Sequence, residues 1–334
     1  MVIDMIKLAT VGTSAICENF LDGMKMSGKF ELAAVYSRNE ATGAAFAEKY
    51  GCNKVFTSLE RMAQWDGADA VYIASPNVFH AEQSRIFLKN KKHVICEKPI
   101  TTNAGEYSEL KKLADDNKLI YMEAIIPRHV KNYNAVKKAV NSIGKILTAR
   151  IDFCQRSSRL DSFLNGNKVN IFDMSLHAGT LMDLGVYCVY GAVDLLGTPT
   201  SIISQVHYMS NGADGSGAAI FEYGNFSAVL SYSKVCQGEI GSEIIGEFGT
   251  VKIKHISQYS GVSLVKNNEE KIIVGYPSKA ELMSGECEKF ANYIRNFDEY
   301  ADDYKASSDL CLSVHKCMDE IKIKAGISYP TYTS

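Results

Sequence analysis

Residues 93–99 read His93-Val94-Ile95-Cys96-Glu97-Lys98-Pro99 and contain the end of a predicted buried strand. Short apolar runs such as 94–96 are typical of strands in a parallel sheet. Polar groups at the carboxyl end of such a strand lie where open α/β sheets bind ligands. Pro99 disfavours the helical region for Lys98, so the lysine is expected at the tip of the strand. The alternative for Glu97 and Lys98 is a surface salt bridge followed by a turn.

A glycine turn follows the first predicted strand, residues 6–11, and precedes helical spacing of apolar residues. In this context a glycine turn lets the N-terminus of a helix receive a pyrophosphate. Ser14 stands at the second glycine position of the usual fingerprint and Cys17 at the third. Ser14 can still offer its N–H and hydroxyl, although the backbone approaches a ligand less easily than with glycine. The predicted pyrophosphate-binding residues are Gly12, Thr13, Ser14, Ala15 and Ile16.

The second predicted strand, residues 30–36, ends in Ser37 and Arg38. Enzymes that use NAD(H) usually have an acidic residue here, which binds the 2′-hydroxyl of the adenosine ribose. A hydroxyl and a guanidinium suit a 2′-phosphate instead. We therefore expect a preference for NADP over NAD. The alternative is that Arg38 only covers the end of the strand at the surface.

Strands and helices alternate through the first 124 residues. The predicted helices are 41–50, 59–64, 78–90 and 103–116, and the remaining strands are 54–56, 70–74 and 119–124. This alternation predicts a doubly wound parallel sheet, a Rossmann arrangement, in a domain covering residues 1–124. The strand 70–74 ends in Ser75, Pro76 and Asn77, and His80 follows one helical turn later. These residues are expected at the same sheet edge as Lys98, although His80 can equally be a helix histidine without a ligand contact.

Residues 125–334 show a different pattern, which predicts an α+β domain with a large, mostly antiparallel open sheet. A helix at 130–140 and a strand at 146–153 come first. Turn signals at 224–225 and 267–268 separate further strands. The predicted strands are 202–209, 218–223, 226–233, 242–246, 250–256, 261–266 and 271–275, and helices 282–297 and 308–324 close the domain.

The segment 178–190 reads AGTLMDLGVYCVY and is the second stretch with candidate functional residues. Asp183, Tyr187 and Tyr190 have spacings of four and seven residues, so they share one face of a helix. The alternative is a helix that buries its apolar side chains and tyrosine rings, with Asp183 at its start.

Composition excludes several classes of function. A net charge of −2 over 334 residues, without a long basic run, argues against nucleic acid or an anionic membrane as a partner. The nine cysteines contain no CxxC pair, and Cys311 and Cys317 are expected as buried thiols. We expect no apolar stretch of membrane-spanning length, and a reducing cytoplasm as the location. His207 and His255 lie in predicted strands without companion ligands, so we expect no metal site.

The glycine turn, the Ser75-Pro76-Asn77 segment with His80, and Glu97-Lys98-Pro99 resemble the Gfo/Idh/MocA oxidoreductase family. The resemblance extends over essentially the whole chain. The segment 123–129 is similar to the one where family members leave the cofactor domain, and the second half of the chain continues the likeness. Most members have a histidine where this chain has Tyr187. A tyrosine there resembles the branch of dimeric dihydrodiol dehydrogenases and glucose-fructose oxidoreductase.

The resemblance implies a hydride transfer between a nicotinamide cofactor and a secondary alcohol or carbonyl of a sugar, polyol or cyclic diol. Lys98, Tyr187 and Asp183 are the implied catalytic residues. Because an adjacent ammonium favours the phenolate, Lys98 and Tyr187 would suit proton exchange with the substrate oxygen. The implied cofactor-binding residues, besides those of the glycine turn, are Ser37, Arg38, Ser75, Pro76, Asn77, His80, Glu97, Lys98 and Arg128. A homodimer, or a higher oligomer, through the second sheet is also implied.

Two other functions remain open at this stage. The first is a regulator or sensor that binds NADP without catalysis. The second is a redox-neutral sugar-processing enzyme with a tightly held cofactor. A proton relay is unnecessary in a pure sensor, so the pair of Lys98 and Tyr187 favours the dehydrogenase. The loop residues Arg156 and Arg159 are further candidates for substrate binding.

Overall fold

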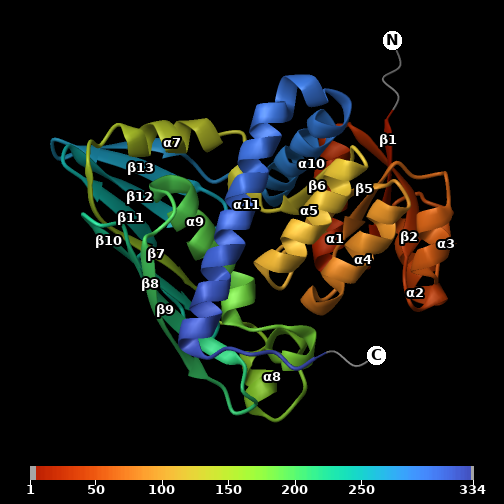
Figure 1. Cartoon of the computed structure of the whole chain (residues 1–334), viewed down its shortest axis with the longest axis horizontal. Helices are drawn as coiled ribbons and strands as arrows, with labels where there is room; N and C mark the ends of the chain where they lie inside the picture. The colour runs from red at the N-terminus through yellow and green to blue at the C-terminus, as the bar shows by residue number, and fades with distance from the viewer. Residues whose placement is uncertain (1–4, 332–334) are drawn as a thin grey trace. The chain divides into compact units, whose positions relative to one another are not determined.

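The computed structural model describes residues 5–331, which belong to two compact units (Figure 1). The first unit combines residues up to 129 with residues 278–308, and the second combines residues 130–277 with the chain from 309 onward. The expected domain boundary after residue 124 lies five residues before the end of the first segment. Residues 278–308, which we expected in the second domain, belong to the first unit instead.

The first unit contains a six-stranded sheet in the order β3-β2-β1-β4-β5-β6, in which all neighbouring strands are parallel. The order reverses between β1 and β4, which is the point where doubly wound sheets bind ligands. The strands are β1 Ile6–Val11, β2 Phe30–Tyr36, β3 Val55–Phe56, β4 Ala70–Ile73, β5 His93–Glu97 and β6 Tyr121–Ala124. The helices are α1 Ala15–Ser27, α2 Glu40–Lys49, α3 Leu59–Gln64, α4 Asn77–Lys89, α5 Ala104–Asp116 and α6 Ile126–His129.

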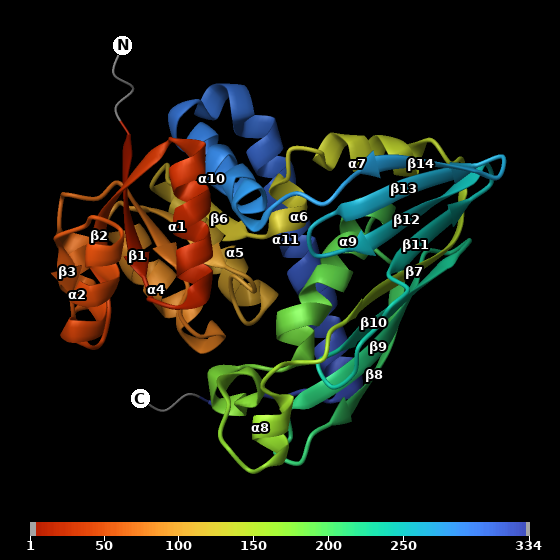
Figure 2. The same cartoon turned by 180° about the vertical axis from the view of Figure 1, so that it is seen from behind.

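Helix α10, Lys279–Arg295, lies beside α1 and joins the core of the first unit (Figure 2). The two helices approach closely because residue 23 is glycine: a Cβ atom there would lie 2.4 Å from the Cβ of Met283. Phe290 of α10 stacks on Phe30 of β2, with ring centroids 5.9 Å apart. This packing explains why a helix so late in the sequence belongs to the first unit.

The second unit contains an eight-stranded sheet in the order β14-β13-β12-β11-β7-β10-β9-β8. Only β7 and β10 pair in parallel, so the expected mostly antiparallel sheet is confirmed. The strands are β7 Ile146–Cys154, β8 Ser201–Tyr208, β9 Asp214–Glu222, β10 Ser227–Ser233, β11 Ser242–Gly246, β12 Gly249–His255, β13 Ser260–Lys266 and β14 Glu269–Val274. The helices of this part of the chain are α7 Tyr133–Asn141, α8 Leu160–Leu164 and α9 Val186–Leu196, and α11 is a single helix over Phe297–Ala325.

Helix α9 packs on the middle of this sheet, against β7 and β10. The segment 174–196 that contains it is long and apolar enough to cross a membrane by length and composition, so our expectation of no such stretch is wrong. Within the segment, 78% of the most apolar window is buried inside the protein. This burial is typical of a core helix, because its apolar side chains already face other parts of the chain.

Candidate active site

Three neighbouring strands of the first unit end at one level. Val11 of β1 pairs with Ile73 of β4, and Ile73 pairs with Cys96 of β5. The residues that come next at this edge are Gly12, Ala74 and Glu97. The sheet therefore brings together the three polar segments that the sequence analysis placed at strand tips.

The glycine turn packs closely against the end of β4 at the start of α1. Gly12 has φ +115°, and a Cβ atom there would lie 3.0 Å from the carbonyl oxygen of Ala74. Ser14 precedes α1 but makes no side-chain capping bond. Cys17 is buried below the turn, so it fills the third fingerprint position without touching the surface. An uncapped helix start beside a glycine is a site where backbone N–H groups bind a phosphate.

Ser37 and Arg38 follow β2 at the same sheet edge. Ser37 is buried, and its hydroxyl oxygen accepts the N–H of Asn39 at 3.3 Å. The side-chain oxygen of Asn39 in turn caps α2 by accepting the N–H of Thr42 at 2.9 Å. Arg38 is exposed. The loop is therefore well ordered, and its guanidinium is the group that faces solvent.

His80 is buried between two loops of the site. Its Nδ1 lies 2.8 Å from the carbonyl oxygen of Pro99, and its Nε2 lies 2.7 Å from that of Ser75. Burial lowers the pKa of His80, although both carbonyls oppose this effect. Both ring nitrogens thus have backbone partners, so His80 links the two loops. Its expected contact with the cofactor stays a prediction.

The segment around His80 has its own internal contacts. The hydroxyl of Ser75 donates to Oε1 of Gln83 at 2.7 Å. Pro76 precedes α4 and its carbonyl accepts the N–H of Phe79 at 2.9 Å, while Asn77 is the first residue of the helix. These contacts fix the loop at the end of β4 below the glycine turn.

Glu97 points into the core of the first unit. The hydroxyl of Tyr72 donates to Oε1 of Glu97 at 2.6 Å, and burial raises the pKa of this carboxyl despite the opposing effects of Tyr72 and Lys98. Glu97 is therefore a buried support of the strand tip, and its expected role as a cofactor ligand stays a prediction. Lys98 is partly exposed between its buried neighbours Glu97 and Pro99, as expected of a residue at the tip, and its peptide bond to Pro99 is cis.

Arg128 belongs to an ionic network between α6, α10 and α11. Its Nη2 lies 2.6 Å from Oδ1 of Asp303 in α11. Asp303 also accepts hydrogen bonds from Lys289 at 2.7 Å and from the hydroxyl of Tyr293 at 2.8 Å. Although burial opposes them, these donors hold the pKa of Asp303 well below its usual range. The guanidinium of Arg128 thus supports α11, where the sequence had suggested a cofactor contact.

The second unit presents Asp183 and Tyr187 on an otherwise buried segment. Between residues 181 and 195, all described, these two are the only residues that are not buried. Tyr190 is 2% exposed, so the prediction that it shares the open face is wrong. Tyr187 and Tyr190 both belong to α9, but Tyr190 packs inside the protein. A π-helical turn, η3 Leu181–Gly185, precedes α9 and contains Asp183. The ring of Tyr187 contacts the ring of Phe153 edge to face, with centroids 5.7 Å apart.

Sequence reasoning missed Lys234, which directly follows β10. Its Nζ lies 2.5 Å from Oδ2 of Asp183. Asp214 of β9 was missed as well: its Oδ2 accepts the N–H of Leu181 at 2.6 Å and thereby fixes the start of η3. The position of Lys234 at the end of a strand was the only signal in the sequence. The contacts Lys234–Asp183 and Asp214–Leu181 join distant segments, so the sequence pattern does not reveal them.

The remaining candidates make local contacts. Arg156 pairs with Asp161 at 2.6 Å on the surface.

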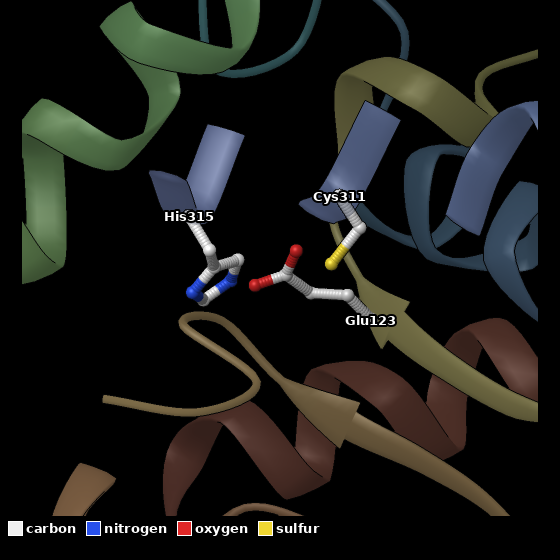
Figure 3. Close-up of side chains that lie close together, drawn as sticks. All are labelled: Glu123, Cys311 and His315. Atoms are coloured by element: carbon white, nitrogen blue, oxygen red, sulfur yellow. The ribbon is translucent and has the colours of Figure 1, made fainter. Parts of the chain in front are cut away.

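Cys311 and His315 are buried one turn apart on the same side of α11, and Figure 3 draws them with Glu123 of β6. Oε1 of Glu123 accepts the N–H of Ile100 at 2.8 Å. Cys317 is also buried, which raises the pKa of its thiol to about 12, so the expectation of buried thiols at 311 and 317 is confirmed.

Comparisons with known proteins agree with this arrangement. Residues 6–125 match the oxidoreductase family with an NAD-binding Rossmann fold, and residues 133–252 match the GFO/IDH/MocA C-terminal domain. The chain is 36% identical to the scyllo-inositol 2-dehydrogenase (NADP(+)) IolU of Bacillus subtilis, over 98% of this chain and 99% of that protein. It is 24% identical to the trans-1,2-dihydrobenzene-1,2-diol dehydrogenase of Xenopus tropicalis, with 90% and 91% covered.

The fold is also similar to that of KijD10, a 3-ketoreductase from Actinomadura kijaniata solved with NADP and TDP-benzene. The TM-score is 0.81 at 20% identity, with 96% of this chain and 98% of that chain covered. The chain therefore belongs to the Gfo/Idh/MocA family of oxidoreductases, and it is an NAD(P)-dependent dehydrogenase acting on CH–OH groups.

Proposed function

We propose that the protein oxidises a secondary alcohol of a cyclic polyol or sugar with NADP, and reduces the corresponding ketone with NADPH. The observation that carries this proposal is the pair of partly exposed polar side chains, Asp183 and Tyr187, on a segment that is otherwise buried. A hydroxyl-rich substrate requires such groups, and the relative from Bacillus subtilis is named for a cyclic polyol.

The preference for NADP rests on the loop after β2. Residues 37–39 offer a hydroxyl, a guanidinium and an amide, and none of them is acidic. A 2′-phosphate binds well to such a set, whereas a free ribose 2′-hydroxyl usually binds a carboxylate. The printed name of the Bacillus subtilis relative also specifies NADP.

The residues around the glycine turn fit the pyrophosphate of this cofactor. The start of α1, which has no side-chain cap, would receive the phosphates, and Ser75 to Asn77 would lie at the neighbouring strand tip. The nicotinamide, when bound, supplies the site that accepts or donates the hydride.

The proton transfer must be performed by side chains. We assign Tyr187 as the group that takes the hydroxyl proton during oxidation and returns it during reduction. Lys98 would stabilise the negative charge on the substrate oxygen and bind the nicotinamide ribose. Asp183 would orient the substrate.

Nicotinamide absorbance with a panel of substrates tests the proposal. Purified protein would be mixed with NADP or NAD and with scyllo-inositol, myo-inositol, D-xylose or D-glucose. We expect turnover with at least one polyol and faster turnover with NADP than with NAD. If no polyol or sugar reacts while NADP still binds, the assigned substrate class is wrong.

We also propose that two copies pair through the open face of the eight-stranded sheet. Ile203, Ile220 and Val229 are exposed and lie opposite one another on β8, β9 and β10. The row of paired residues across these strands continues into charged residues on β7, β11 and β12. A contiguous apolar surface bordered by charges is typical of interaction sites. The charged residues are Arg150, Glu243 and Lys252.

Light scattering tests this pairing. We expect a dimer for the wild type and a shift towards monomer for Val229→Glu, which places a charge in the apolar half of the row. A wild type that remains monomeric at micromolar concentration contradicts the pairing.

A reducing cytoplasm is the proposed location, because none of the nine cysteines forms a disulfide. Cell fractionation of the native protein tests this proposal. Recovery from an oxidising compartment contradicts it.

A further inference from the structure

We propose that Lys234 is a specificity-determining positioning residue. It would hold the carboxylate of Asp183 towards the substrate, so that the enzyme requires a second hydroxyl beside the reacting carbon. This inference rests on the proposed function and names a structural requirement for its substrate.

The two partners of this ion pair have very different environments. The side chain of Lys234 is 4% exposed, whereas that of Asp183 is 40% exposed. The lysine therefore approaches the carboxylate from inside the protein, and the aspartate presents its open side to solvent. Such an arrangement suits a carboxylate that binds a ligand on one side and is held from the other.

Burying Lys234 is costly unless its charge is compensated. Besides Asp183, its Nζ lies 3.5 Å from the carbonyl oxygen of Ile171 and 5.7 Å from the centre of the Phe172 ring. Neither of these contacts neutralises an ammonium. Asp183 is thus the carboxylate that pairs with Lys234.

Asp214 is the other acid near Lys234, but its role is to fix the backbone at Leu181. It is fully buried, which raises its pKa to about 6 even though the Leu181 N–H and Lys234 oppose this effect. Its Oδ2 is occupied by the N–H of Leu181. Asp214 therefore anchors the start of η3, while Lys234 acts on the aspartate that the segment presents.

The backbone around Lys234 is fixed on both sides. Its N–H donates to the carbonyl of Gly215 at 3.0 Å, and its own carbonyl accepts the N–H of Ser157 at 2.9 Å. The hydroxyl of Thr180 also donates to the carbonyl of Gly215, at 2.8 Å. The same part of β9 thus holds both the lysine and the segment with Asp183, so their relative position is well defined within the second unit.

Asp183 and Tyr187 are the two partly exposed side chains of this segment, and the ion pair fixes one of them from inside the protein. Asp183 can then accept a hydrogen bond from a substrate hydroxyl next to the one that exchanges its proton with Tyr187.

Substrate discrimination by variants tests the inference. The probes are scyllo-inositol and a deoxyinositol that lacks a hydroxyl beside the reacting carbon. A hydrogen bond to a charged group changes kcat/KM by about 10- to 100-fold, so we expect the wild type to prefer scyllo-inositol by this factor. Lys234→Met should lose most of the preference through a higher KM for scyllo-inositol, and Lys234→Arg should retain it.

The stabilisation of each variant by NADPH is the control for folding, because the cofactor fingerprint lies in the first unit. Asp183→Asn provides a second variant that removes the same interaction without emptying a buried site, and it should lose the preference as well. An unchanged preference in Lys234→Met, or in Asp183→Asn if the lysine variant does not fold, overturns the inference. If the wild type converts neither compound, the proposed polyol function fails first, and the inference fails with it.

Discussion

Glu286 in α10 is a buried acid whose ionisation should reduce the stability of the protein. Its side chain is 1% exposed, and neither carboxylate oxygen has a hydrogen-bond partner. Burial raises its pKa well above the usual value, the nearby Glu97 raises it further, and Lys279 opposes both. The folded protein therefore keeps a proton on this carboxyl over a range of pH in which the unfolded chain has released it.

The pH dependence follows from this difference. Because the pKa of Glu286 is higher in the folded state, its unfavourable effect is absent below the pKa of the unfolded chain. The effect grows as the pH rises towards the folded pKa. Each pH unit in this window lowers the free energy of unfolding by about 1.4 kcal/mol. Between pH 5 and pH 7 the loss is therefore at most about 2.7 kcal/mol.

Glu286→Gln removes the ionisable group while keeping the shape of the side chain. We expect the variant to be more stable than the wild type at pH 7, and this advantage should shrink towards pH 5. Urea denaturation at several pH values measures the difference, with Glu288→Gln, a partly exposed residue on the same helix, as the matched control. A destabilised variant at pH 7, or a difference independent of pH, would refute the assignment of a buried neutral acid.

Three other substitutions test separate parts of the argument. Tyr187→Phe should lower kcat by about 10²- to 10⁴-fold while NADPH still raises the melting temperature, because only the acid/base group is lost; full activity removes Tyr187 from the mechanism. Arg38→Ala should weaken NADP binding more than NAD binding, as measured by the ratio of kcat/KM for the two cofactors, and an unchanged ratio means that Arg38 does not bind the 2′-phosphate. Asp303→Asn should lower stability by about 3 kcal/mol at neutral pH, because it leaves the buried guanidinium of Arg128 uncompensated. The pKa of Asp303 is lowered in the folded state, so the loss of stability should disappear as the pH falls through that pKa. A difference in the free energy of unfolding between wild type and variant that is the same at all pH values contradicts this assignment.

The sequence was sufficient to predict the architecture. Apolar runs and polar strand ends have a local cause, so β1, β4 and β5 and their shared edge could be inferred before the structure. The mostly antiparallel second sheet followed from alternation and turn residues in the same way. The position of α10 could not be inferred, because it depends on the missing side chain of Gly23, far away in the sequence.

The site was predictable in position but less so in the direction of its side chains. His80 and Glu97 lie where the pattern placed them, yet buried carbonyls and the hydroxyl of Tyr72 engage their polar atoms. Buried polar groups need partners, and here those partners come from other segments of the chain. Lys234 was missed for the same reason, since nothing near it in the sequence indicates a contact with Asp183.

The π-helical turn at Leu181–Gly185 is equivalent to one extra residue inserted into an α-helix. Removing one residue from it should restore ordinary helical geometry and leave the residues on either side close to their present directions, because the wide turn absorbs the extra residue. Asp183 lies inside the turn, so its direction should change although no functional side chain had been replaced. Insertion and deletion at this turn, more than substitution, is therefore the route by which relatives of this chain could acquire a differently arranged substrate site.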